Sequence, residues 1–355
     1  KVGTNLISSP LGISQQKIDE IVNGIVALRD AGISVLLVTS GAVGLGAKEL
    51  HLSGKAKTVV LRQTCASIGQ PILMSHYREA FKAHGAVCAQ VLITKKELND
   101  RTTFVNLRNS VTSLLNHGVI PIFNENDTVS TDEVGTAVGD NDRLSAFVAS
   151  KIDADLLILL TDIDGLYSRD PKVDPDAQLL HEVEVITDEI MESAGKAGSM
   201  YSTGGMKTKL LAARIASYAG CATVIASGFE PNILTSIIEG KRVGTYFAPL
   251  KRMHQRPRWI LHSAPSGTIW IDDGAIEALK NHKSLLPSGI VGVDGTFEAG
   301  EVVMINKIAK AVPYYNSSEI IERIGNTSKN RGTHSKKGRA DVIFRPEDIM
   351  FIDNL

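Results

Sequence analysis

Apolar residues in the first part of the chain follow two alternating patterns, one helical and one strand-like. Between Ile18 and Leu28 they recur at intervals of three and four residues, which is the spacing of one buried helix face. Ser14 precedes this stretch as a suitable N-cap, and Gly32 follows it as a suitable stop. We therefore predict a helix that begins after Ser14 and ends before Gly32.

Short, unbroken apolar runs alternate with such helical stretches over the first 250 residues. A run that is apolar on both faces is typical of a strand in a parallel sheet that helices cover on both sides. The pattern therefore predicts an α/β fold, a three-layer αβα sandwich with a mainly parallel sheet. The predicted strands are residues 34–39, 87–93, 119–123, 155–160 and 222–226.

The rhythm changes after Arg258, where short β-like pieces are separated by Gly, Pro and Asp turns. This change predicts a small, β-rich, barrel-like second domain. We expect a first domain at residues 1–250, a linker at 251–257 and a second domain at 258–355. In the second domain the β-like pieces are residues 259–261, 268–271, 301–305 and 340–344, and the helical pieces are 273–281 and 319–324.

Composition and charge limit the class of protein. Hydrophobic residues make up 43% of the chain, yet no apolar run approaches the ~20 residues of a membrane-spanning helix. Cys65, Cys88 and Cys221 lack the spacing of metal ligands, so we expect reduced thiols, a cytoplasmic location and no dedicated metal site. The net charge of −1 gives no bulk attraction to nucleic acid. The basic run 329–339 leaves RNA binding open as a secondary activity.

Polar residues follow the predicted strands, at the edge where an α/β sheet binds its ligands. Asn124 and Asp127 come directly after one strand, and Asp140, Asn141 and Asp142 open the next helical stretch. Carboxylates suit an ammonium group and amides suit a carboxylate, so these two clusters complement an amino acid. A third segment, 40–46, fits a carboxylate or phosphate at a helix N-terminus, and equally a tight turn with a capping serine.

Two further strand ends and one helix start suit a phosphate group. The segment 1–5 combines a lysine with a glycine, and Thr161 and Asp162 end the most hydrophobic strand. The glycine-rich segment 203–209 opens a helix, where backbone N–H groups and a lysine favour negative charge. The spacing is not that of a Walker loop or of a dinucleotide fingerprint. The sequence thus indicates a phosphate-binding site beside polar clusters that complement an amino acid.

These segments together resemble the amino acid kinase family, and the resemblance covers essentially the whole chain. The two Asn/Asp clusters are similar to those of its glutamate-phosphorylating members, and residues from about Arg258 onward resemble a PUA domain. Departures are Asn5, where many relatives have serine, the loop 130–138, and the segment 309–315. The segments that carry the resemblance are residues 1–4, 38–42, 124–127, 138–142, 160–162, 165–167 and 204–209.

The resemblance implies a role for individual residues. Lys1 and Lys209 would stabilise the phosphoryl group in transfer, and Asp142 would orient both lysines. Residues expected to bind the substrate are Ser40, Gly41, Asn124, Asp127, Asp140 and Asn141. Residues expected to bind ATP are Lys1, Gly3, Thr161, Asp162, Thr203, Gly204, Gly205, Met206, Lys207, Thr208 and Lys209.

The resemblance also implies the reaction and its setting. The expected activity is phosphorylation of the side-chain carboxylate of L-glutamate by ATP with Mg²⁺, which gives L-glutamate 5-phosphate in the first step of proline biosynthesis. Expected partners are proline as a feedback inhibitor, further copies of the chain in a dimer or tetramer, and glutamate-5-phosphate reductase as recipient of the product. The alternatives are another small-molecule kinase of the same family, and RNA binding through the PUA-like domain, which we do not expect to be the principal function.

Overall fold

The structure is a computed structural model of the chain. Its chain contacts divide it into two compact units, Lys1–Arg252 and Met253–Leu355, and each unit is described here by itself. The residues that the structure describes are 1–9, 12–52, 56, 58–94, 97, 101–129, 141–171, 173–196, 205–250, 254–329 and 342–352.

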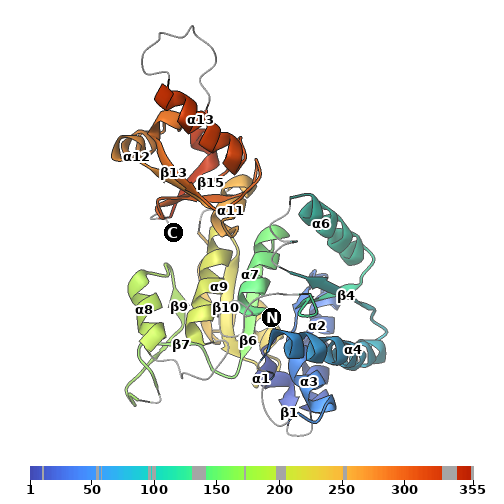
Figure 1. Cartoon of the computed structure of the whole chain (residues 1–355). Helices are drawn as coiled ribbons and strands as arrows, with labels where there is room; N and C mark the ends of the chain where they lie inside the picture. Colours follow the sequence, from blue (N-terminus) through green and yellow to red (C-terminus); the bar gives the residue numbers. More distant parts are fainter. Residues whose placement is uncertain are drawn as a thin grey trace. The chain divides into compact units, whose positions relative to one another are not determined.

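The first unit alternates strands and helices along the chain (Figure 1). Its helices are α1 (Thr4–Ile7), α2 (Gln15–Asp30), α3 (Ala42–Glu49), α4 (Val59–Ala83), α6 (Arg101–Asn116), α7 (Asn141–Lys151), α8 (Asp188–Lys196), α9 (Met206–Tyr218) and α10 (Ile233–Ile238). Its strands are β1 (Ser8–Ser9), β2 (Gly12–Ile13), β3 (Leu37–Val38), β4 (Cys88–Ile93), β5 (Ile120–Glu125), β6 (Leu156–Thr161), β7 (Leu166–Tyr167), β8 (Leu179–Leu180), β9 (Glu182–Val183), β10 (Ala222–Ser227) and β11 (Thr245–Phe247).

The first three residues join two sheets into one. The strand orders are β4–β5–β3 on one side and β6–β10–β11–β9 on the other. Between them, the backbone N–H of Val2 donates to the carbonyl of Val38 at 2.8 Å, and the N–H of Leu160 donates to the carbonyl of Lys1 at 2.9 Å. All the strand pairs in this combined sheet are parallel except β10–β11. This confirms the mainly parallel sheet that the sequence predicted. Lys1 therefore lies at the centre of the sheet.

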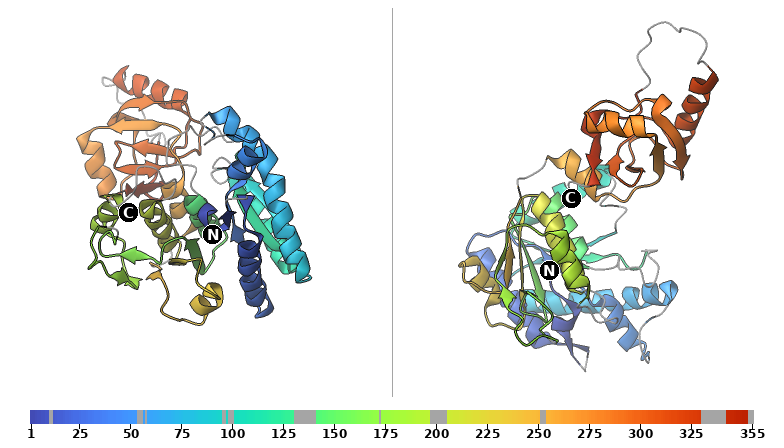
Figure 2. Two further views of the ribbon diagram at one scale, coloured as in Figure 1. Left: turned by 90° about the horizontal axis from the view of Figure 1, so that it is seen from below. Right: turned by 90° about the vertical axis from the view of Figure 1, so that its left-hand side faces the viewer.

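Helices cover both faces of this sheet, which confirms the three-layer sandwich. Successive strand residues alternate between the faces, so Leu160 and Ile122 pack with α2 and α4, whereas Leu159 and Phe123 belong to the opposite side. On that opposite side α7 and α9 run side by side (Figure 1, Figure 2). Both helices begin at the edge where β3, β5 and β6 end, and this arrangement brings their first turns to the polar strand ends.

The predicted helix after Ser14 is present as α2. The Ser14 side chain accepts a hydrogen bond from the backbone N–H of Lys17, which satisfies one free donor of the first turn. Ile18, Val22 and Ile25 are buried, as their spacing predicted. The helix ends at Asp30, and Gly32 follows with φ +84°, a conformation that favours glycine.

The second unit is built around a mixed sheet with the order β13–β12–β14–β15–β16. Trp259, expected in a strand, instead lies in a helix, because its segment places Ile260 and Leu261 on a buried helical face. The elements are α11 (Gln255–His262), β12 (Thr268–Ile271), α12 (Asp273–Lys280), η1 (Pro287–Gly289), β13 (Ile290–Asp294), β14 (Val303–Ile305), β15 (Ala309–Ala311), α13 (Ser317–Lys329), η2 (Pro346–Asp348) and β16 (Ile349–Phe351).

Some sequence expectations fall on residues outside the described part of the chain. These are the loop 130–138, Asp140, Thr203, Gly204, most of the basic run 329–339 and the first residues of the expected linker 251–257. Gln255, also in that expected linker, lies in α11. Within the described residues, no helix combines the length and the apolar character needed to cross a membrane.

Candidate active site

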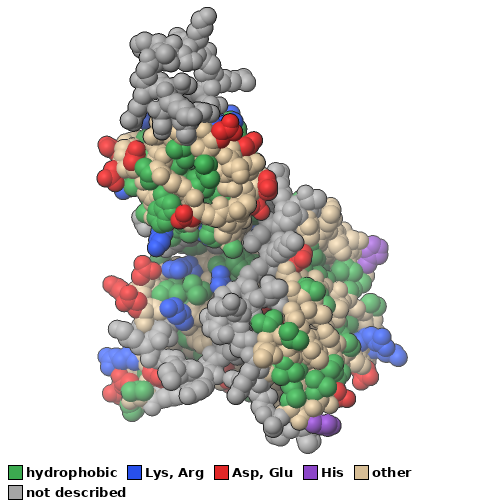
Figure 3. Space-filling model, viewed as in Figure 1, with side chains coloured by type: hydrophobic (Ala, Val, Ile, Leu, Met, Phe, Trp, Pro, Cys, Tyr) green, Lys and Arg blue, Asp and Glu red, His purple; other side chains and the backbone are tan. Residues whose placement is uncertain are grey.

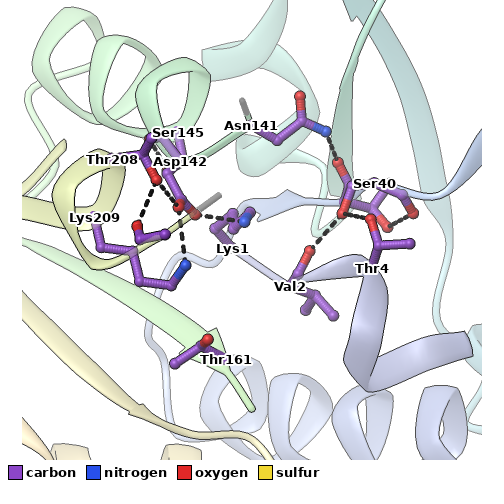
Figure 4. A network of polar contacts seen from close by, with 12 residues as sticks. Lys1, Val2, Thr4, Ser40, Asn141, Asp142, Ser145, Thr161, Thr208 and Lys209 are labelled. Carbon is purple, nitrogen blue, oxygen red and sulfur yellow. Dashed lines mark hydrogen bonds and ion pairs between the residues drawn. The ribbon is translucent and has the colours of Figure 1, made fainter. Parts of the chain in front are cut away.

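Two lysines and one aspartate meet at the centre of the sheet edge (Figure 4). Lys1 precedes the central bridge, Asp142 lies in the first turn of α7, and Lys209 lies in the first turn of α9. The Lys1 ammonium donates to one Asp142 carboxylate oxygen, and the Lys209 ammonium donates to the other at 3.2 Å. The Thr208 hydroxyl also donates to that second oxygen at 3.1 Å. The three charged side chains are 7%, 0% and 7% exposed, so this is a buried cluster with an excess of one positive charge.

The electrostatics of the cluster keep Asp142 ionised. Burial by itself raises the pKa of a carboxyl group, because it penalises the charged form. The charges and hydrogen bonds of Lys1 and Lys209 oppose this effect and hold the pKa of Asp142 below its ordinary value. The aspartate thus fixes two ammonium groups in one place and neutralises only one of them. Such a cluster can stabilise negative charge that gathers beside it.

A chain of amide side chains lies behind the strand ends. Asn141 donates to the side-chain oxygen of Asn124 at 2.9 Å and also to the backbone carbonyl of Thr39. Asn124 in turn donates to Gln70 of α4 at 2.8 Å, and Gln70 donates to Gln90 of β4 at 3.0 Å. Asn124 and Asn141 are buried, so their amide orientations are set by these partners.

Ser40 and Gly41 lie between this amide chain and α1. The Ser40 hydroxyl donates to the carbonyl of Val2 at 3.0 Å and accepts from the Thr4 hydroxyl at 3.1 Å (Figure 4). Gly41 caps α3 with φ +106°, which strains any residue with a Cβ atom. A pocket of about 210 Å³ opens beside Gly41 and Thr4, and Lys48 also contributes to its wall.

Asp127, which follows β5, and Arg62 of α4 form a looser ion pair. A guanidinium nitrogen of Arg62 lies 3.8 Å from an Asp127 carboxylate oxygen, and the two side chains are 34% and 19% exposed. Burial raises the pKa of Asp127 above its ordinary value, and the nearby Arg62 opposes that rise only in part. Ser67 of α4 contacts Thr128 through their hydroxyl oxygens at 3.2 Å, which ties this helix to the segment after β5.

Thr161 and Asp162 end β6 on the other side of the lysine cluster. The Thr161 hydroxyl donates to one Asp162 oxygen at 3.0 Å, and the Asn5 amide donates to the other at 2.9 Å. Burial by itself raises the pKa of Asp162, but these hydrogen bonds, a backbone hydrogen bond and the charge of Lys209 together hold it below its ordinary value. The backbone N–H of Gly3 donates to the carbonyl of Leu160 at 3.2 Å, so the glycine lies beside the same strand end.

The first turn of α9 begins directly after Gly205. Gly205 is its N-cap residue and has no side chain that could bind the free N–H groups of the first turn. Met206 is half-buried and Lys207 is exposed, whereas the Thr208 hydroxyl donates to the Gly205 carbonyl at 2.8 Å. The described part of this segment therefore places a helix N-terminus, which favours negative charge, close to the Lys209 ammonium.

Sequence reasoning missed Arg62 and Gln70, both on α4. The two residues lie at four-residue intervals with the buried Ala66, and Gln70 continues toward the buried Leu73 and Tyr77. A polar side chain within such an apolar stripe is a signal of a buried hydrogen-bond partner. Tyr77 itself contacts the Thr39 hydroxyl at 2.9 Å, and burial raises its pKa to about 12.

None of the three cysteines forms a disulfide bond, and Cys65 and Cys221 are buried. Among the residues that the structure describes, no three His, Cys, Asp or Glu side chains gather in a group that suits a metal ion. Both oxygens of Asp142 and both oxygens of Asp162 already accept hydrogen bonds from the protein. The described carboxylates of the lysine cluster and of the β6 end are thus engaged by protein donors.

Comparisons with known proteins find matches to both units of the chain. The sequence profile of the Amino acid kinase family matches residues 1–227, and the profile of the PUA domain matches residues 267–331. A curated protein named glutamate 5-kinase from Methanosarcina barkeri is 42% identical over 95% of this chain and 89% of its own length. Another of that name from a Thermoanaerobacter species is 41% identical over 90% of this chain and 88% of its own length.

Among solved structures, a UMP kinase from Bacillus anthracis is 16% identical, with a TM-score of 0.46 over 70% of this chain and 93% of that chain. This likeness is too weak to carry a functional inference. The family profile alone covers more than half of the chain, and the curated relatives match it nearly end to end. This chain belongs to the amino acid kinase family.

Proposed function

We propose that this chain phosphorylates the side-chain carboxylate of L-glutamate with ATP, the reaction of a glutamate 5-kinase and the first step of proline biosynthesis. The observation that carries the proposal is the buried cluster in which Lys1 and Lys209 both bind Asp142. Relatives named glutamate 5-kinase support it, since they are 41–46% identical over most of the chain.

The chemistry needs no general base. A glutamate side-chain carboxylate has a reference pKa near ~4.3, so it is already an anionic nucleophile at neutral pH. One of its oxygens forms a bond to the γ-phosphorus of ATP, and the bond from that phosphorus to the bridging oxygen breaks and releases ADP. The obstacle is repulsion between two anions. The Lys1 and Lys209 ammonium groups offset it, and Asp142 holds both in place.

We assign the polar groups on one side of the lysine cluster to one substrate and those on the other side to the second substrate. Asn124 and Asn141 lie on the side that leads to Asp127, and we assign this side to glutamate together with Ser40, Gly41 and Asp140. The β6 end and the start of α9 lie on the other side, and we assign them to ATP. The residues assigned to ATP are Lys1, Gly3, Thr161, Asp162, Thr203, Gly204, Gly205, Met206, Lys207, Thr208 and Lys209.

Mg²⁺ enters with ATP in this proposal. Asp142 and Asp162 already accept hydrogen bonds from the protein on both oxygens, so phosphate oxygens and water are left to bind the ion. When bound, Mg²⁺ supplies further positive charge to the phosphates. The chain's own residues position the phosphates through the α9 N-terminus and the two lysines.

The test is ADP formation from ATP with a panel of acceptors: L-glutamate, L-aspartate, N-acetylglutamate, carbamate and UMP. Hydroxylamine in a parallel reaction traps an acyl phosphate as a hydroxamate. We expect ADP and hydroxamate with L-glutamate only. Turnover of a different acceptor, or of glutamate without hydroxamate, would reassign the chain within the amino acid kinase family.

Regulation and assembly belong to the same proposal. Proline is expected to inhibit competitively with glutamate, and a titration of proline against the initial rate measures this. A dimer or tetramer is supported by hydrophobic side chains on the surface over α3 and α4 (Figure 3). Exposed apolar residues of this part of the chain are Leu50, Leu52 and Val60. Light scattering on the purified chain gives the subunit number, and a monomer contradicts this part of the proposal.

The product is a reactive acyl phosphate, so we place the chain in the cytoplasm beside glutamate-5-phosphate reductase. Transfer between the two enzymes is measured with an excess of hydroxylamine as competing trap. Direct transfer leaves the reductase rate unchanged by the trap, whereas release into solution lowers it.

A further inference from the structure

Arg62 lies next to the carboxylate that we assign to the substrate's ammonium group. It projects from the first turns of α4, and its guanidinium is 3.8 Å from Asp127. That separation exceeds the 2.7–2.9 Å typical of a charge-assisted hydrogen bond, so the two groups attract each other without a direct bond. Among the described residues, neither side chain takes a second polar partner.

This arrangement differs from an ordinary structural ion pair. A guanidinium has five N–H donors in a planar fork, and this fork matches a carboxylate that accepts two bonds at once. Here the fork is one-third exposed and Asp127 is one-fifth exposed, so both can reach a ligand. The pKa of Asp127 is raised by burial, so the carboxylate gains from any cation that comes closer than Arg62.

A free amino acid presents the matching pair of charges. Its α-ammonium complements Asp127 and its α-carboxylate complements a guanidinium next to Asp127. On this basis we propose that Arg62 binds the α-carboxylate of glutamate and thereby determines substrate specificity. The inference rests on the proposed function, because it concerns the same bound amino acid.

The proposed contact also explains which carboxylate is phosphorylated. Glutamate carries two carboxylates, and both attract a lysine cluster. A guanidinium that holds the α-carboxylate at Asp127 leaves only the side-chain carboxylate free to extend past Asn124 and Asn141 toward Asp142. Arg62 thus acts both on affinity and on the direction in which the substrate lies.

Two truncated substrates separate the roles of Arg62 and Asp127. 4-Aminobutyrate is glutamate without its α-carboxylate, and glutarate is glutamate without its ammonium group. The experiment measures kcat and KM of ADP formation for all three compounds in the wild type, Arg62→Gln and Asp127→Asn. Arg78→Gln, at an exposed position of the same helix, removes an equal charge and serves as the matched control.

For Arg62→Gln we expect the KM for glutamate to rise about tenfold or more while kcat changes less than about threefold. The kcat/KM for 4-aminobutyrate stays at the wild-type value, so the preference for glutamate over 4-aminobutyrate falls by the same factor. Asp127→Asn loses instead the preference for glutamate over glutarate. Arg62→Lys, which keeps the charge but not the fork, recovers part of the preference.

The inference is wrong if Arg62→Gln lowers kcat/KM for glutamate and 4-aminobutyrate equally, or lowers neither. Equal loss would mean that Arg62 only supports Asp127, and Arg62→Gln would then have no further effect on kcat/KM in the Asp127→Asn background. A wild type that turns over none of the three compounds refutes the proposed function itself. The two failures are therefore distinguishable.

Discussion

The two ends of the proposed glutamate site hold their charges in opposite ways. At the phosphoryl end, both oxygens of Asp142 are bound directly by Lys1 and Lys209, and all three side chains are almost fully buried. At the amino-acid end, Arg62 and Asp127 remain 3.8 Å apart and partly exposed. The charged groups at the first end bind one another directly, whereas those at the second end make no direct hydrogen bond to each other and take no other polar partner among the described residues.

This difference follows from what each end has to do. At the phosphoryl end, negative charge shifts among the phosphate oxygens as the phosphoryl group is transferred, so the cations there must already be fixed in place. The amino-acid end binds charges that are present from the start, and bonds formed there contribute to affinity. Substitutions at the first end should therefore act on kcat and stability, and substitutions at the second end should act on KM.

The largest effect is expected on stability when Asp142 is removed. Asp142→Ala leaves two buried ammonium groups without their counter-ion, which should lower the free energy of unfolding by about 3–5 kcal/mol. Because the pKa of Asp142 is lowered in the folded state, the stabilisation is present above its ordinary value of about 3.9 and is lost as the pH falls through the folded-state value. Urea unfolding at several pH values measures both effects.

The matched control for that variant is Asp30→Ala, which breaks an exposed pair with Arg29. An exposed pair contributes less than about 1 kcal/mol, so this variant should unfold almost like the wild type. Equal stability of Asp142→Ala and the wild type would contradict the view that the lysines depend on Asp142.

A smaller effect in free energy, but a large one in rate, is expected for Lys209→Ala. Loss of one fixed cation should lower kcat about a hundredfold with glutamate, with a KM within about threefold of the wild type. Steady-state ADP formation measures both constants, and circular dichroism checks the fold. Lys82→Ala, at the exposed end of α4, is the control and should keep full activity. A Lys209→Ala variant that changes only KM would remove the distinction between the two ends.

A pH profile tests the amino-acid end. Protonation of Asp127 removes the charge that holds the substrate's ammonium group. Burial raises the pKa of Asp127, so the KM for glutamate should rise as the pH falls toward that raised value, at a pH where an ordinary aspartate is still ionised. In Asp127→Asn the KM should be about tenfold higher at neutral pH and should lose this pH dependence. A wild-type profile that matches that of Asp127→Asn would assign the titration to another group.

The smallest effect is expected for the amide chain. Gln70→Leu leaves the Asn124 amide without its acceptor in a buried position, which should cost about 1 kcal/mol of stability and raise the KM for glutamate a few-fold. Gln90→Leu removes the exposed last link of the chain and should have less effect on both quantities. If Gln90→Leu raised the KM as much as Gln70→Leu, the effect on Asn141 would not weaken with each further hydrogen bond from Asn141, and this interpretation of the amide side chains would be wrong.

The sequence predicted the large domain better than the details of its site. Continuous apolar runs such as residues 156–160 are typical of strands in a covered parallel sheet, and β6 and β10 lie where such runs occur. Lys1, Asp142 and Lys209 each stand at an element end beside polar or glycine neighbours, and the resemblance to the amino acid kinase family implied that the three act together. The second unit was harder, since three residues such as 259–261 carry too little periodicity to separate a strand from the helix that they form.

Arg62 and Gln70 were not predicted because their partners are remote in the sequence. Gln70 binds Asn124 across 54 positions, and this contact depends on how α4 packs against β5. The spacing of apolar residues along the sequence indicates that a residue faces the core, but not which residue it contacts there. The structure adds these pairings. The loose pair of Arg62 with Asp127 is the one that distinguishes the amino-acid end from the phosphoryl end.

The central claim is that the lysine cluster transfers a phosphoryl group to the side-chain carboxylate of glutamate. Glutamate labelled with oxygen-18 in that carboxylate tests it directly, because attack by the carboxylate carries a labelled oxygen into the acyl phosphate. When this product cyclises, the leaving phosphate keeps that oxygen. The account predicts labelled phosphate from the wild type, in proportion to the ADP formed. Unlabelled phosphate formed at the same rate with or without glutamate would contradict it.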